Sequence, residues 1–238
     1  PFKFPPPAGF QPLNAANVRP ETVITRPDQY VKTVLWTGNS TARSIVTNNA
    51  PDFVWTKLRN TGNNHKLFDS VRGIEKRLES STTNGESTES GTVTSFNSDG
   101  FSLGTAGNVN GSYNYVAWCW KAGGNKNTFN VDDVGYASFA ASGTTAGTIT
   151  PTGTSIGTKQ GFSIIKYQGT GANATIPHGL SQSLDFVIVK TLTDSSINWT
   201  LWHNVLAGTE YLTFTSNEKG SQAAVWNSTV PTSSVINV

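Results

Sequence analysis

The 238-residue chain contains 36% hydrophobic but only 13% charged residues, and its formal net charge at neutral pH is +2. Charged residues make up about 25% of an ordinary globular domain, and a chain with so few of them lacks the polar faces of amphipathic helices, which excludes a helical bundle. The basic residues form no face-sized cluster and no apolar run approaches the roughly 20 residues of a membrane-spanning helix, so we expect no nucleic-acid partner and no membrane span.

The first predicted segment is a proline-rich arm at residues 1–29. Proline fixes the backbone angle φ and has no N–H group, so its density here disfavours helices and central strands. We predict an extended arm or the end of a preceding domain. The sequence starts at Pro1 rather than at Met and has no segment of the signal-peptide type, so we expect a fragment or a processed product.

The rest of the chain contains an internal duplication. Residues 34–59 and 164–192 each run from an apolar stretch, through an aromatic-x-Gly turn, to an Asp-Phe-Val-x-x-Lys block that starts at Asp52 or Asp185. Further matches follow at a constant offset: residues 65–71 align with residues 199–205, and Leu78 aligns with Leu212. A duplicated sequence indicates a duplicated structural unit.

Short apolar runs separated by Gly and Asn turns are typical of antiparallel strands, and residues 97–100 form such a turn. We therefore predict an all-β fold with two tandem antiparallel β-sandwich repeats, of jelly-roll or concanavalin-like type, at residues 30–122 and 161–238. These are called the first and the second repeat. The Gly-, Ser- and Thr-rich residues 123–160 are predicted to form a partly ordered bridge, with a flexible linker as the alternative.

The first repeat ends in a strand for which the second repeat has no counterpart. Residues 113–120 are apolar on both faces, which is typical of a central, buried strand. The second repeat stops at Val238 before any such strand and is predicted to be incomplete at its C-terminal side. We expect that either more chain follows or a neighbouring subunit donates the strand, and we favour continuation of the chain.

Six blocks of sequence carry a family resemblance. They are PDFVWTKLRN at 51–60, HKLFDSVRG at 65–73, TVTSFNSDGFSLG at 92–104, YVAWCWKAGG at 115–124, TIPHGL at 175–180 and NWTLWHN at 198–204. Together they resemble an uncharacterised β-rich repeat family of structural proteins from tailed bacteriophages, especially marine phages and cyanophages. Residues 2–14 are similar to the closing stretch of a SPRY or concanavalin-like domain.

The resemblance implies a virion protein. It implies a tail-fibre or other adsorption component located in the virion, with other virion proteins as partners and assembly into a homo-oligomer, most often a trimer. It supplies no catalytic residues. The alternatives are a capsid decoration protein and a glycan-hydrolysing tail-spike enzyme.

The residues that could carry chemistry favour a protein without enzymatic activity, metal or cofactor. The three histidines, His65, His178 and His203, lack metal-binding spacing and do not recur between the repeats, so we predict structural or surface roles for them. The acid pairs Asp132–Asp133 and Glu86–Glu89 lie in polar loop sequence, whereas a glycosidase holds two acids across a cleft. Because Cys119 is the only cysteine, no intramolecular disulfide can form.

Aromatic residues provide the remaining functional signal. Trp199, Trp202 and Trp226 lie near predicted strand or loop ends, where an exposed ring can stack on a sugar. Most tryptophans in such places are core or subunit-interface residues, and the functional alternative is that these three contact a host surface glycan. The sequence thus predicts a bacteriophage tail-fibre protein that contributes to host attachment.

Overall fold

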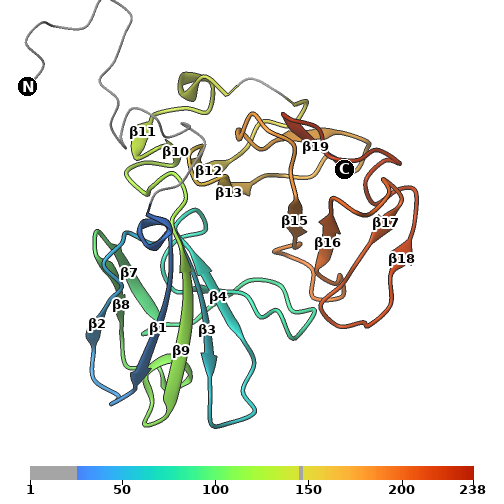
Figure 1. The fold of residues 1–238 in the computed structure, drawn as a ribbon. Helices are drawn as coiled ribbons and strands as arrows, with labels where there is room; N and C mark the ends of the chain where they lie inside the picture. The colour runs from blue at the N-terminus through green and yellow to red at the C-terminus, as the bar shows by residue number, and fades with distance from the viewer. Residues whose placement is uncertain (1–25, 145–146) are drawn as a thin grey trace, which may run out of the picture.

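The computed structural model describes residues 26–144 and 147–238, and these residues form an almost entirely β structure (Figure 1). The predicted all-β class is confirmed. Residues 1–25 of the predicted arm lie outside the described residues, and so does the stretch 2–14 with its SPRY-like resemblance. A 3₁₀ turn, η1 (Pro27–Gln29), precedes the first strand. None of the described helices is long and apolar enough to cross a membrane.

The first repeat contains nine strands and one short helix. They are β1 (Val31–Thr37), β2 (Arg43–Val46), β3 (Phe53–Leu58), β4 (Lys66–Asp69), β5 (Lys76–Arg77), β6 (Ser87–Thr88), β7 (Val93–Asn97), β8 (Gly100–Leu103), α1 (Gly107–Asn110) and β9 (Asn114–Trp120). One sheet has the order β1-β9-β3-β4 and a second has the order β2-β8-β7. The predicted turn joins β7 to β8 as a tight antiparallel hairpin, in which Asn97 pairs with Gly100.

These two sheets face each other across the main core. The alternation of side chains along β9 sends Tyr115, Ala117 and Cys119 inward, and all three are fully buried. They pack with Trp36 and Phe101 and with the rest of a cluster drawn from both sheets: Ile45, Val54, Leu58, Phe68, Val93, Leu103 and Val109. The prediction that residues 113–120 form a central strand is confirmed, because β9 pairs with β1 on one side and β3 on the other.

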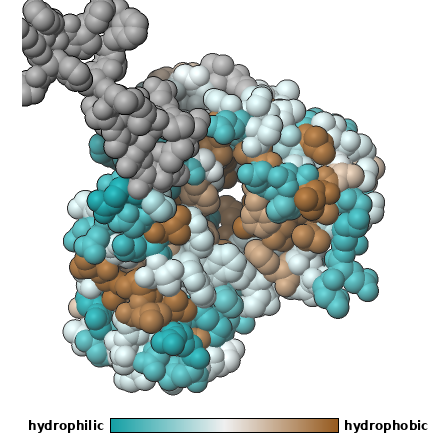
Figure 2. Space-filling view, viewed as in Figure 1, coloured by the Kyte–Doolittle hydropathy of each residue, from teal (hydrophilic) through white to brown (hydrophobic). Residues whose placement is uncertain are grey.

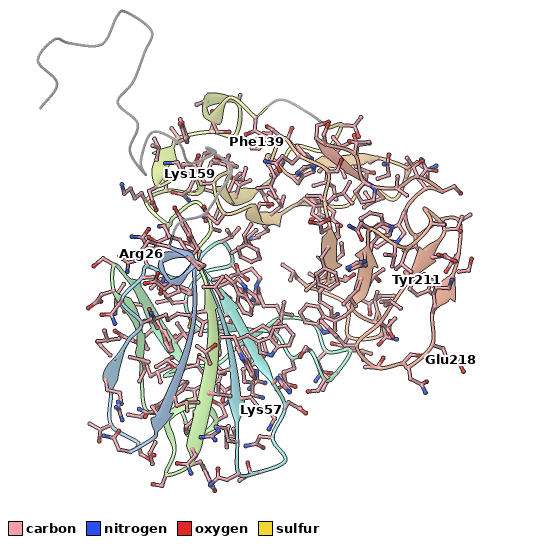
Figure 3. All side chains as sticks on the ribbon, viewed as in Figure 1. Arg26, Lys57, Phe139, Lys159, Tyr211 and Glu218 are labelled. Atoms are coloured by element: carbon pink, nitrogen blue, oxygen red, sulfur yellow. The ribbon has the colours of Figure 1, made fainter. Side chains whose placement is uncertain are left out.

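The bridge is ordered in its described part. It contains β10 (Phe129–Val131), β11 (Val134–Tyr136), a 3₁₀ turn η2 (Ala140–Ser142) and β12 (Gly153–Gly157), which pairs with β13 (Phe162–Lys166) of the second repeat. The sheet order is β11-β10-β12-β13, so the bridge and the second repeat share one sheet. Figure 3 labels Phe139 and Lys159 in this region, beside the lobe of the first repeat.

The second repeat continues with β14 (Thr175–Pro177), β15 (Phe186–Val189), β16 (Thr200–His203), β17 (Glu210–Tyr211), β18 (Gly220–Ser221) and β19 (Val235–Asn237). Its pairs β14–β19, β15–β16 and β17–β18 correspond to β2–β8, β3–β4 and β5–β6 of the first repeat. An isolated bridge joins Leu201 to Leu212, as one joins Leu67 to Leu78. The aligned leucines of the sequence therefore occupy equivalent places in the two repeats.

The repeats contact each other through these equivalent places. Leu67, Leu78, Leu201 and Leu212 belong to one apolar cluster, together with Trp199 and partly buried residues of both repeats. The indole Nε1 of Trp199 donates a hydrogen bond to the Glu79 carbonyl at 2.9 Å. Beside this contact, the space-filling view shows a hollow between the two lobes (Figure 2).

Candidate functional site

The three tryptophans predicted to contact a glycan are buried. Their exposed fractions are 4% for Trp199, 3% for Trp202 and 1% for Trp226. Trp199 is covered by the contact between the repeats, whereas Trp202 and Trp226 pack with Val187 and Ile236 inside the second repeat. None of them offers the exposed ring that sugar stacking needs, so the hypothesis of glycan contact is wrong for these three residues and the core role is the observed one.

A different set of aromatic residues lies half-buried on the outer side of the first-repeat sheet. In β3, Phe53 and Trp55 alternate with the buried Val54, so their side chains point away from the core. In β9, Trp118 and Trp120 alternate with Cys119 in the same way. The aromatic face is defined here by five half-buried residues: Phe53, Trp55, His65, Trp118 and Trp120.

The rings of the aromatic face contact one another in a continuous series. Trp118 is stacked on His65, with 6.4 Å between ring centroids and an interplanar angle of 14°. His65 meets the edge of Trp55 at 5.9 Å, Trp55 meets Phe53 at 6.4 Å, and Phe53 meets Trp120 at 5.5 Å. Side chains held by a sheet and by each other form a rigid surface.

His65 gives this surface one polar group. The Trp55 Nε1–H donates to His65 Nδ1 at 2.8 Å, so the neutral ring carries its proton on Nε2. Burial, followed by the charge of Lys57, lowers the pKa of His65 below its ordinary value, which keeps the ring neutral at neutral pH. Among the described residues no hydrogen bond uses Nε2, so this N–H is available as a donor.

The second repeat contacts the middle and one end of the aromatic face. Phe162 lies 6.1 Å from Phe53 and 6.4 Å from Trp120, and Phe214 lies 5.8 Å from Trp55. The face therefore lies on the side of the first repeat that contacts the second repeat, and Figure 2 shows a hollow between the two lobes. A flat ligand such as a sugar ring could stack there with its edge toward His65.

Sequence analysis missed this face although a signal was present. Phe53 and Trp55, like Trp118 and Trp120, are spaced two residues apart, which places each pair on one side of a strand. Because both sides of β9 are apolar, both were predicted to be buried. The missing information was that, within the part of the chain that the structure describes, no second sheet covers the outer side.

The acidic residues are held by partners. Asp132 accepts from the Thr158 N–H at 2.8 Å, and Asp133 pairs with Lys121 at 2.5 Å. Glu86 and Glu89 pair with Arg72 and Arg77. These contacts give the four acids turn-forming and ion-pairing roles.

The largest ionic cluster lies on β4 and β5 and in the turns around them. Lys66 forms a buried ion pair with Glu79, and Arg72 pairs with Asp69 at 2.5 Å. Burial alone would raise the pKa of Glu79, but the hydrogen bond and charge of Lys66, with Arg77 and Asn64, outweigh it and hold that pKa below its ordinary value. The cluster is a structural network, and a shallow pocket beside it is lined by Arg77, Glu79 and Ser195.

The remaining candidate residues have structural surroundings. His178 is 1% exposed, accepts the Leu180 N–H at Nδ1 and contacts the Thr232 carbonyl through Nε2, at 3.2 Å each. His203 accepts the Val205 N–H at 3.3 Å. Burial raises the pKa of the free Cys119 thiol to about 12, so it is unreactive. Within residues 26–144 and 147–238, no group of His, Cys, Asp and Glu side chains could hold a metal ion.

Comparison with known proteins gives one match. The sequence model of a family described as "Domain of unknown function (DUF7483)" matches residues 26–238, which covers both repeats and the bridge. No curated protein and no solved structure matches the chain. Since one family model spans nearly the whole sequence, the chain belongs to the DUF7483 family.

Proposed function

We propose that the protein is a non-enzymatic component of a bacteriophage tail fibre or similar adsorption apparatus, and that it contributes to host attachment by binding a surface glycan on its aromatic face. The observation that carries the glycan part is the series of five contacting rings, half-buried on a rigid sheet. The virion part rests on the resemblance of six sequence blocks to phage structural repeats. We also propose that both repeats are sandwiches of jelly-roll or concanavalin-like type.

The chemistry of the aromatic face suits a neutral sugar. A pyranose ring presents apolar C–H groups on one side and hydroxyl groups at its edge, so it stacks on an aromatic ring and accepts hydrogen bonds at the edge. Trp118 supplies the stacking surface and the His65 Nε2–H supplies a donor beside it. No charged partner is needed, which agrees with the low charge of the chain.

The glycan role can be tested on an array of host surface polysaccharides. We expect Trp118→Ala to weaken binding about fivefold or more, because loss of one aromatic stacking partner costs roughly 1–3 kcal/mol for a nucleic-acid base, and Trp118→Phe to retain most of the binding. Leu35→Ala is the matched control, since Leu35 is an apolar side chain on the same sheet that is 58% exposed. Equal binding by all three variants, with unchanged circular dichroism, would remove the aromatic face from consideration.

The virion role has separate tests. Labelled antibody should decorate the tail of the virion, and the native mass should correspond to a trimer. Decoration of the head would favour the capsid alternative. Release of reducing sugar from host polysaccharide would favour the tail-spike enzyme.

A further inference from the structure

The second repeat has a gap where the first repeat has its central strand. In the first repeat β9 lies between β1 and β3 and is antiparallel to both. The equivalent strands β13 and β15 do not pair with each other, and within the described residues no strand lies between them (Figure 1). Each of them has one paired edge, with β12 and β16 respectively.

The unpaired edge of β13 is the one that faces the gap. The Lys166 carbonyl is on the edge paired with β12, where it accepts the Thr152 N–H at 2.7 Å. Backbone groups alternate in direction along a strand, so those of Ser163 and Ile165 are directed to the opposite edge. This alternation matches the first repeat, in which the Gly38 N–H donates to the Tyr113 carbonyl next to β9 at 2.9 Å.

Side chains along the gap are more exposed than their first-repeat equivalents. Phe53 is half-buried against Trp120 of β9, but its equivalent Phe186 is 48% exposed. Ile188, the equivalent of Trp55, is 38% exposed. Two apolar side chains at an unpaired edge are the pattern of a strand-pairing site.

The core of the second repeat is split into two clusters at the same place, with Val238 packed against both. In the first repeat, inward side chains of β9 join those of β1 and β3 in one cluster. In the second repeat, Ile165 and Tyr167 belong to one cluster and Val187 belongs to another. A β9-type strand would lie between these clusters and unite them.

An aspartate at the end of the gap lacks the partners that its equivalent has. Asp52 accepts hydrogen bonds at Oδ2 from the N–H groups of Ala122 and Gly124, directly after β9, at 2.8 and 3.0 Å. In the second repeat, Asp185 accepts at Oδ1 from Asn204 Nδ2 at 2.6 Å. Among the described residues, none donates to Oδ2 of Asp185.

We propose that the gap between β13 and β15 is a strand-acceptor site for a β9-type strand. The occupant is an extended segment, apolar on both faces and antiparallel to both edges, followed by a Gly-rich turn whose N–H groups bind Asp185. Residues 114–124 have this chemistry and serve as its template.

The test uses the full chain with residues 104–124 appended after Val238. We expect a higher melting temperature, and amide exchange slowed about tenfold or more at Ser163, Ile165, Phe186 and Ile188. Asp185→Ala should lower the melting temperature of the extended chain but leave that of the original chain nearly unchanged. The control is the same extension with proline in place of the copies of Val116 and Trp118, which removes strand hydrogen bonds and should give no protection.

Two further measurements keep the proposal open to refutation. If the extended chain does not fold, a synthetic peptide of residues 112–124 added to the original chain should protect the same four amides; protection by neither extension nor peptide would overturn the proposal. The proposal would also be overturned if these amides were already protected in the original chain, without extension or peptide, and if its native mass were that of a dimer. The gap would then be an interface between two copies.

Discussion

The same substitution at two aligned positions should have different consequences. Asp52 is 2% exposed and accepts two backbone N–H groups, those of Ala122 and Gly124, which are themselves buried. Asp52→Ala leaves both N–H groups without a partner. Asp185 is exposed and loses only its hydrogen bond from Asn204.

The magnitudes follow from burial. A buried donor left unsatisfied costs about 1–3 kcal/mol, so Asp52→Ala, which leaves two of them, should lower the free energy of unfolding by about 2–6 kcal/mol. Burial raises the pKa of Asp52, meaning that the charged form is already disfavoured in the native state, and this places the expected loss toward the lower end of that range. At an exposed site the loss from Asp185→Ala should be about 0.5 kcal/mol or less.

Urea unfolding followed by tryptophan fluorescence measures both effects. With a slope of about 2 kcal/mol per molar urea, Asp52→Ala should lower the midpoint by roughly 1–2 M. Asp52→Asn is the matched control, because its amide oxygen can still accept both N–H groups, and it should cost about 1 kcal/mol or less. Equal losses from Asp52→Ala and Asp185→Ala, or a loss from Asp52→Asn as large as from Asp52→Ala, would refute the hydrogen-bond argument.

Three other expectations concern stability. Burial lowers the pKa of His178 in the folded state. The free energy of unfolding should therefore fall as the pH drops from about 6.5, the pKa in the unfolded chain, through the lower pKa of the folded state. His178→Gln should flatten this pH dependence, and an unchanged pH profile would contradict the argument. Lys66→Met should lower the free energy of unfolding by about 3–5 kcal/mol, because it leaves Glu79 buried without its main partner. Adding Glu79→Leu should recover much of this loss in urea unfolding. A double variant less stable than Lys66→Met alone would count against the argument. The free energy of unfolding should fall by about 2–5 kcal/mol in each of the variants Leu67→Ala and Leu201→Ala. Their double-variant cycle should show a coupling energy of at least about 0.5 kcal/mol, because the two leucines share one cluster. Strict additivity would argue that the repeats unfold independently.

The sequence was sufficient to predict strands and their equivalence but not their exposure. Period-two alternation and the aligned Leu78 and Leu212 led to the β class and to a duplicated unit, and the structure has equivalent bridges at these leucines. The burial of Trp199 could not be derived in this way, because it depends on how one repeat packs against the other. The same reason explains why the aromatic face was missed: whether Trp118 is covered depends on contacts between segments distant in sequence.

Three differences between the repeats lie where they touch. At equivalent positions, His65, Lys66 and Glu79 of the first repeat are replaced by Trp199, Thr200 and Thr213 in the second. If both repeats kept the Lys–Glu pair, their contact would bury two ion pairs, and the desolvation penalty of each would oppose association. Replacing one pair with threonines, and one histidine with a tryptophan that donates to the Glu79 carbonyl, allows two copies of one unit to pack through the same face. Divergence at this contact therefore makes the two repeats complementary where they pack, with the ion pair on the first and the tryptophan on the second.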